Sequence, residues 1–175
     1  MKIYLASSFD LVPVVQSVAD YLEARGHTIV VKWWSKDGFD MRDKKIDKTS
    51  RKFYEDPVCR LIFERDLAGV KHADAFVLVC GDTPRKFNGA NVEYGIAIAL
   101  GKPCYSIGAL DNSAMYHPIT QCKTVRGLVS HIGLVCPLCG NEMAEETLAL
   151  GGGGRSFRYG FRCSDRACDL LKVVD

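Results

Sequence analysis

The sequence has no long apolar run and almost no net charge. Every apolar run falls well short of the ~20 residues that a membrane-spanning helix needs, which argues against an integral membrane protein. The formal net charge is +2, too small to indicate nucleic acid or a membrane surface as a partner. The apolar part of residues 1–6 is too short for a signal peptide. We therefore expect a cytoplasmic protein.

The length of 175 residues fits one ordinary domain with a small appendage. Hydrophobic residues make up 47% of the chain, which is enough for a packed core. The pattern of the chain changes near residue 134, where the spacing of the cysteines becomes the main feature. We therefore expect an α/β domain over residues 1–134 and a four-cysteine unit over residues 135–175.

Strand and helix patterns alternate through the first of these units. Apolar and β-branched runs predict strands at Lys2–Ala6, Thr28–Trp34, Ala73–Val79 and Pro103–Ile107. Apolar residues at helical spacing predict helices at Val12–Arg25, Pro57–His72 and Val92–Leu100, and a short strand and helix near residues 124–132. Such alternation is typical of a doubly wound, mostly parallel sheet of the Rossmann or flavodoxin-like kind.

Glu93 is the most informative residue of this domain. It follows a buried parallel strand and a glycine, and the pattern places it in the first turn of a helix. The carboxyl ends of parallel strands are where open α/β sheets bind ligands. The helix dipole is expected to keep a carboxylate there ionised. Such a group can act as a nucleophile, or it can simply complement the dipole.

A charged, irregular segment lies between Trp34 and Glu55. A loop of this length in a compact α/β domain is usually functional or disordered. Because it follows the carboxyl end of a strand, it can reach the same cleft as Glu93. One interpretation is a mobile lid over the ligand, and the other is a solvated surface excursion.

The eight cysteines form two groups. Four are scattered through predicted helices and strands, where buried thiols without a function explain them: Cys59, Cys80, Cys104 and Cys122. The other four have the spacing of a zinc ribbon, a β-hairpin held by one metal ion: Cys136, Cys139, Cys163 and Cys168. A site of four thiolates has no open position, so we predict a structural Zn²⁺. A redox dithiol is the alternative.

Aromatic and basic residues alternate along one predicted strand of the ribbon. Phe157, Tyr159 and Phe161 fall on one face, and Arg158 and Arg162 fall on the other. Aromatic and basic faces can bind nucleic acid. Packing of the ribbon against its host domain is the interpretation that we favour.

Four segments in order give the first domain a resemblance to a known family. Lys2–Phe9, Glu64–Leu67, Gly89–Gly95 and Gly101–Pro103 are similar to segments of the nucleoside 2-deoxyribosyltransferase family, which includes 2'-deoxynucleoside 5'-phosphate N-hydrolases. None of the four is specific alone, but their order and spacing are. The zinc ribbon is an addition to the usual family plan.

The resemblance implies three catalytic residues. Glu93 would trap the anomeric carbon of the sugar covalently, as the carboxylate of a retaining glycosidase does. Tyr4 would orient Glu93 through a hydrogen bond. Asp66 would bind a sugar hydroxyl or assist proton transfer to the departing base. Asp74 is expected to be structural. No cofactor is expected for the catalysis itself.

The resemblance also implies a nucleoside or nucleotide substrate and shared sites in at least a homodimer. Ser7 and Ser8 follow the first strand, where a 5'-phosphate could bind, and Ser8 resembles a serine of the nucleotide hydrolases. Asn112, Ser113 and Met115 resemble a segment that family members donate to the neighbouring subunit. Ser113 favours the hydrolases and Asn112 the transferases, so both water and a second base stay open as acceptors, with a preference for 5'-monophosphates and hydrolysis.

Base recognition departs from the family pattern. The positions shortly before Glu93 carry Lys86, Phe87 and Asn88 where relatives often have an aspartate or serine. Asn88 is the best substitute, because its amide both donates and accepts hydrogen bonds. Gly89 begins the segment that carries Glu93. Trp33, at the expected end of the second strand, could stack on the base.

A non-enzymatic interpretation stays open on the sequence alone. The same α/β plan could serve as a nucleotide-sensing module whose ribbon contacts nucleic acid or protein. Glu93 would then bind ribose hydroxyls instead of attacking carbon.

Overall fold

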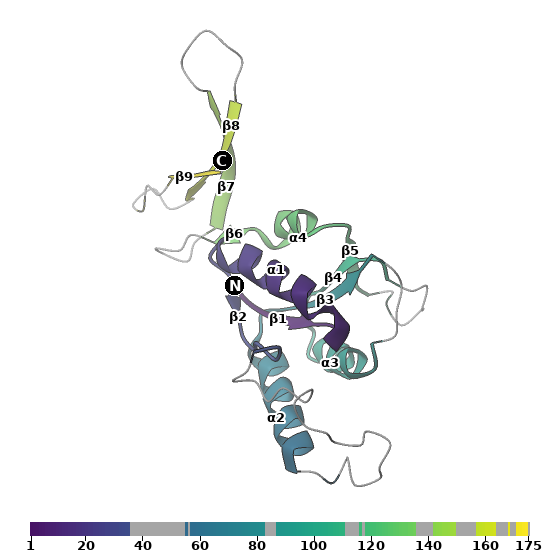
Figure 1. Ribbon diagram of the computed structural model, residues 1–175. Helices are drawn as coiled ribbons and strands as arrows, with labels where there is room; N and C mark the ends of the chain where they lie inside the picture. Colours follow the sequence, from purple (N-terminus) through teal and green to yellow (C-terminus); the bar gives the residue numbers. More distant parts are fainter. Residues whose placement is uncertain are drawn as a thin grey trace.

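The computed structural model describes residues 1–35, 55, 57–82, 87–110, 116, 118–135, 142–149, 157–163, 168 and 171–174. Its first part is an all-parallel, five-stranded sheet in the order β2-β1-β3-β4-β5 (Figure 1). This order is the flavodoxin-like one, and it confirms the predicted α/β class. The strands are β1 (Lys2–Ala6), β2 (Thr28–Ile29), β3 (Ala75–Gly81), β4 (Cys104–Gly108) and β5 (Thr120–Cys122).

Four α-helices cover the two faces of this sheet. Buried residues of one cluster join α1 and α4 to the sheet, and buried residues of another join α2 and α3 to its opposite face. None of the helices in the described ranges has the length and apolar character needed to cross a membrane. Their bounds are α1 (Val12–Glu23), α2 (Pro57–His72), α3 (Asn88–Ala99) and α4 (Val125–Ile132), and a short 3-10 helix η1 (Phe9–Leu11) precedes α1.

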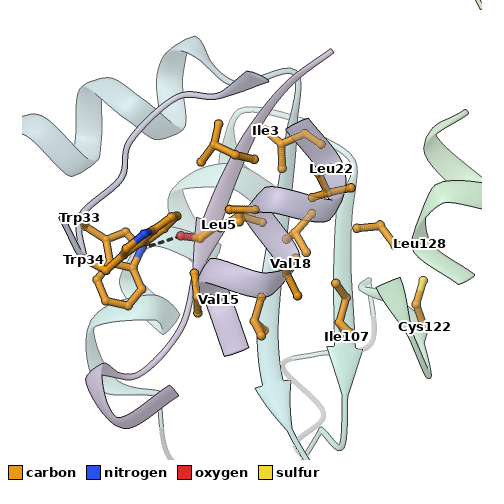
Figure 2. Packing of buried hydrophobic residues seen from close by; sticks show 14 of the residues in the cluster. Ile3, Leu5, Val15, Val18, Leu22, Trp33, Trp34, Ile107, Cys122 and Leu128 are labelled. Atoms are coloured by element: carbon orange, nitrogen blue, oxygen red, sulfur yellow. Dashed lines mark hydrogen bonds between the residues drawn. The ribbon is translucent and has the colours of Figure 1, made fainter. Parts of the chain in front are cut away.

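Alternation along β1 decides which face each side chain occupies. Ile3 and Leu5 pack against α1 (Figure 2), whereas Tyr4 and Ala6 belong to the cluster under α2 and α3. All four side chains are fully buried. The strand therefore directs Tyr4 towards the face that α2 and α3 cover.

The predicted elements are largely confirmed, and the second strand is the clearest correction. β1 and α2 have the predicted bounds, but β2 ends at Ile29 instead of Trp34. The chain turns after β2, where the Ser35 amide donates to the Lys32 carbonyl at 3.0 Å. Trp33 donates its indole N–H to the Leu5 carbonyl at 2.8 Å (Figure 2). At Trp33, the side-chain hydrogen bond to Leu5 takes the place of the backbone pairing that the β-branched pattern predicted.

A second, antiparallel sheet follows in the order β6-β7-β8-β9. The sequence predicted a two-stranded hairpin here, and the two central strands correspond to it. Two short strands, one on either side of that hairpin, extend it to four. The bounds are β6 (Leu134–Val135), β7 (Glu142–Ala149), β8 (Phe157–Cys163) and β9 (Leu171–Val174).

Candidate active site

The candidate site is a cavity of about 340 Å³ at the carboxyl edge of the parallel sheet. Ser7, which follows β1, and Glu93, on the helix after β3, both line it. β1 and β3 are neighbours in the sheet, and the connections leave them in opposite directions along it. A crevice at such a switch point is where flavodoxin-like folds bind ligands, and the volume suits a small molecule.

Most of the cavity wall is apolar, and a few polar groups converge on it. The polar lining residues are Ser7, Arg65, Asp66 and Glu93. A small number of fixed polar groups on a mostly apolar wall is typical of sites that bind small molecules. The rest of the lining comes from the loop after β1, from Trp33 and from the facing sides of α2 and α3: Phe9, Trp33, Cys59, Ile62, Phe63, Leu67, Gly89, Ala90, Val92 and Ile96.

Tyr4 and Glu93 form the central contact of the site. The Tyr4 hydroxyl donates to Oε1 of Glu93 at 2.8 Å, across 89 positions of sequence. The Tyr4 ring is fully buried and lies 6.1 Å from the Phe76 ring, nearly parallel to it. The contact therefore joins a rigid strand residue to a carboxylate at the cavity wall and fixes one of its oxygens.

Asp66 reaches the same cavity from α2, paired with the preceding residue. Nε and Nη2 of Arg65 both lie 2.8 Å from Oδ1 of Asp66. The side chains are 25% and 16% exposed, respectively, so water screens this pair only in part. The cavity thus contains two carboxyl groups and one guanidinium group.

The site raises the pKa of both carboxyl groups. Burial, reinforced by the negative charge of Asp66, raises the pKa of Glu93 to about 7, against the opposing effects of the Tyr4 hydrogen bond and Arg65. Burial also raises the pKa of Asp66, and Arg65 opposes it. Burial and the two carboxylates raise the pKa of the Tyr4 hydroxyl, so Tyr4 stays a hydrogen-bond donor. The titrations of the two carboxyl groups are coupled, because the negative charge of Asp66 raises the pKa of Glu93.

The electrostatic expectation for Glu93 was wrong in one respect. α3 begins at Asn88, so Glu93 lies in its second turn and not its first. The helix dipole weakens beyond the first turn, while burial of the carboxylate is costly. Glu93 is therefore not held ionised by the helix. Its charge depends on the contact with Tyr4 and on the protonation of Asp66.

Of the predicted binding residues Ser7, Ser8 and Trp33, the structure places Ser7 and Trp33 at the cavity. Ser7 lines the cavity, but its hydroxyl donates to the Val79 carbonyl at 2.7 Å. Ser8 is half-buried, and its hydroxyl donates to the carboxylate of Asp10. Trp33 lines the cavity with its indole N–H engaged by Leu5, so it offers an apolar surface.

The remaining binding predictions are placed in part. Gly89 lines the cavity, whereas Asn88 is exposed at the start of α3 and does not belong to the lining. Three predicted residues lie outside the described residues: Asn112, Ser113 and Met115. So does most of the charged segment between Trp34 and Glu55 that was interpreted as a lid. These roles stay predictions.

The predicted zinc cysteines are described only in part. Cys163 ends β8 and pairs with Met143 of β7, and Cys168 is half-buried. Cys136 and Cys139 lie outside the described residues. Among the residues that are described, no group of three or more His, Cys, Asp or Glu is placed to hold a metal ion. The zinc site therefore also stays a prediction.

Arg65 and Cys59 are cavity residues whose place in the site the sequence analysis did not predict. Arg65 had no assigned role, although it directly precedes Asp66 and its charge faces that carboxylate. Cys59 was interpreted as a buried thiol, but it is only half-buried and lines the cavity. Asp74 accepts a 2.7 Å hydrogen bond from the Lys2 amide, which fits its predicted structural role.

Comparison with known proteins decides the family. The sequence profile described as Nucleoside 2-deoxyribosyltransferase matches residues 3–144. The chain belongs to this family. It is accordingly an enzyme of the nucleoside 2-deoxyribosyltransferase and N-glycosidase group, whose substrates are nucleosides or nucleotides. No functionally curated protein gives a significant sequence match.

Two solved structures resemble this family member at low sequence identity. One is a 2-deoxyribosyltransferase from the psychrotolerant bacterium Bacillus psychrosaccharolyticus, with a TM-score of 0.50 and 21% identity over 73% of this chain and 90% of that one. The other is a CMP N-glycosidase from Clostridium botulinum, with a TM-score of 0.44 and 16% identity over 75% of this chain and 98% of that one. The first likeness supports the fold of this deoxyribosyltransferase family member.

Proposed function

We propose that this enzyme cleaves the N-glycosidic bond of a nucleoside or 2'-deoxynucleoside, or of its 5'-monophosphate, through a covalent glycosyl-Glu93 intermediate. The observation that carries the proposal is the 2.8 Å hydrogen bond from Tyr4 to Glu93 at the wall of a cavity that also contains Asp66. A carboxylate fixed by a buried donor, with a second carboxyl group beside it, is the set of groups that retaining glycosidases use.

The reaction then has two balanced steps. In the first, an oxygen of Glu93 bonds to the anomeric carbon while the bond to the base nitrogen breaks, and the electron pair leaves with the base. Asp66 supplies the proton that the leaving base takes up, because burial raises its pKa. In the second, water or another base attacks the anomeric carbon and gives its proton to the Asp66 carboxylate, while the bond from the carbon to Glu93 breaks and the Glu93 carboxylate is released.

The pH dependence of kcat/KM tests the role of Tyr4. We expect an acidic limb above the ordinary pH range of a carboxyl group, because ionised Glu93 is the nucleophile and burial raises its pKa. In Tyr4→Phe this limb should move to higher pH, since the hydrogen bond that lowers the pKa of Glu93 is lost. The measurement is the rate of base release against pH at low substrate concentration.

Tyr21→Phe is the matched control for this substitution. Tyr21 lies on α1 and stacks under the Arg25 guanidinium at 3.4 Å, so its hydroxyl is outside the cavity lining. We expect its acidic limb to stay at the wild-type position. An unmoved limb in Tyr4→Phe, or equal movement in both variants, would contradict the assigned role of Tyr4.

The acceptor is decided by analysing the products. We favour water as the acceptor, on the resemblance of Ser8 and Ser113 to serines of the nucleotide hydrolases. The experiment incubates the protein with deoxynucleosides and their 5'-monophosphates, with and without a free acceptor base, and separates the products by chromatography. Free base formed without acceptor supports hydrolysis. New nucleosides that form only with acceptor would make the enzyme a transferase.

The proposal extends to the 5' end of the substrate, where we favour a monophosphate over a free hydroxyl. The preference for a 5'-monophosphate rests on the loop that carries Ser7 and Ser8. Phosphate binding there requires the carboxylate of Asp10 to move away from the hydroxyl of Ser8, because a carboxylate repels phosphate. A higher kcat/KM for monophosphates than for nucleosides supports the preference, and the reverse order would overturn it.

We also propose a structural Zn²⁺ on the four clustered cysteines. Support comes from their spacing and from the antiparallel sheet that carries Cys163 at the end of β8. Metal analysis should give one zinc per chain, and Cys163→Ser should lower the zinc content and the stability of the C-terminal sheet. Full occupancy in Cys163→Ser would contradict the assignment.

The enzyme is further proposed to act as at least a homodimer. Support comes from family membership and from large apolar side chains at the cavity that are about half exposed: Phe9 (46%), Phe63 (52%) and Val92 (57%). A second subunit would cover them. Light scattering that gives the mass of one 19.4 kDa chain would contradict the dimer.

A further inference from the structure

Gly69 is a buried glycine inside α2 that faces β1. Glycine in a helix interior is about 0.5–1 kcal/mol less favourable than alanine, so a close approach is the natural reason for its presence. A Cβ at Gly69 would lie 2.4 Å from Cγ2 of Val31 and 2.9 Å and 3.0 Å from Cε2 and Cδ2 of Tyr4. Carbon atoms in contact prefer about 3.5–4.0 Å. The helix can therefore lie this close to Tyr4 only without a side chain at this position.

The Tyr4 ring has little freedom to move away from a methyl group. It is fully buried, packs beside Phe76 and is tied to Glu93 through its hydroxyl. Val31 is only half-buried, so its methyl group can rotate aside. The remaining overlap falls on one edge of the ring. Tilting the ring about its Cβ displaces the hydroxyl more than the contacted edge, and the bond to Glu93 lengthens.

Movement of the helix would affect the same cluster. Asp66 lies three residues before Gly69, on a neighbouring position of the helix surface. If α2 moved away from β1 to accommodate a methyl group, Asp66 would be displaced with it. Both responses alter the geometry of the Tyr4, Glu93 and Asp66 side chains. Gly69 itself is absent from the cavity lining.

We propose that Gly69 is a positioning residue, which holds the Tyr4 hydroxyl on Glu93 by allowing α2 to pack directly against the tyrosine ring. This inference rests on the proposed function, because it assigns Glu93 the reacting role. It concerns a residue that touches neither the cavity nor the reacting atoms. Its effect is transmitted through Tyr4.

The test compares Gly69→Ala in two backgrounds. With Tyr4 present, Gly69→Ala should lower kcat/KM by about 10- to 100-fold, as small misplacements of reacting groups do. The acidic limb should move to higher pH, as expected for Tyr4→Phe. In the Tyr4→Phe background the same substitution should lower kcat/KM less than it does with Tyr4 present, because the hydrogen bond is already absent and only a displacement of Asp66 can still contribute.

Two further variants separate positioning from folding. Gly127→Ala on α4 is the matched control, since its Cβ would lie 3.7 Å from Oγ1 of Thr124 and 3.8 Å from Cβ of Cys122, in ordinary contact. It should leave kcat/KM unchanged. Val31→Ala removes the 2.4 Å overlap and keeps the one with Tyr4. Gly69→Ala compared within the Val31→Ala background therefore tests the tyrosine contact even if the single variant folds poorly.

The outcomes distinguish this inference from the proposed function. Equal losses in the wild-type and Tyr4→Phe backgrounds, or an unmoved acidic limb, would overturn the positioning role while base release by the wild type persists. Absence of base release by the wild type would overturn the proposed function. A ¹³C NMR titration of the Glu93 carboxyl group then still tests the positioning: its pKa should be higher in Gly69→Ala than in the wild type, and an unchanged pKa would refute it.

Discussion

Glu93→Gln should lower base release by several orders of magnitude and leave ligand binding nearly intact. The amide has the shape of the carboxylate and can still accept the Tyr4 hydrogen bond, so the cavity keeps its form. It has no anionic oxygen to bond to the anomeric carbon, and the covalent step is lost. Chromatography of released base, combined with calorimetric titration of the substrate, measures both quantities.

Glu23→Gln is the control for the chemical change. Glu23 lies on α1, on the opposite face of the sheet, and pairs with Lys32 at 2.8 Å. Its loss should leave base release unchanged, since a largely exposed ion pair contributes little. Base release by Glu93→Gln within about tenfold of the wild type would exclude a nucleophilic role.

Asp66→Asn should give the second-largest effect, a loss of about 10²- to 10⁴-fold on natural nucleosides. An asparagine amide cannot deliver the proton that the departing base requires. An activated leaving group such as nitrophenolate departs from the sugar without a proton. For a nitrophenyl glycoside, the loss of activity in Asp66→Asn should therefore be under about tenfold.

The two substrates separate the two roles considered for Asp66. If Asp66 bound a sugar hydroxyl, its replacement would lower the rate equally with either leaving group. Equal losses of rate would therefore favour that role over proton transfer. Asp20→Asn, an exposed position on α1, should leave both rates unchanged.

Periodicity sufficed for elements whose residues pack on a regular face. The bounds of β1 and α2 follow from alternation and helical spacing. Tyr4 was correctly placed on the first strand, but it lies in the middle of β1 and not at its end. β2 was predicted too long because β-branched residues continue to residue 31. The contact of Trp33 with the Leu5 carbonyl, 28 residues away, depends on tertiary structure.

The chemistry of the site depended still more on contacts across the chain. The sequence pattern singled out Glu93 as a candidate nucleophile, whereas Tyr4 and Asp66 were identified only through the family resemblance. It could not place Arg65 on Asp66 or show that burial raises the pKa of Glu93. The role inferred for Gly69 depends on distances to Val31 and Tyr4, which no local pattern contains.

Covalent labelling of Glu93 tests the central claim most directly. A deoxynucleoside carrying fluorine at the 2' position should slow both steps, because fluorine disfavours the oxocarbenium-like transition states. After incubation and digestion, mass spectrometry should find the fluorosugar on the peptide that contains Glu93, and Glu93→Gln should stay unlabelled. Labelling of Asp66 or another residue, or release of base with no sugar bound to the protein at any time sampled, would contradict the glycosyl-Glu93 mechanism.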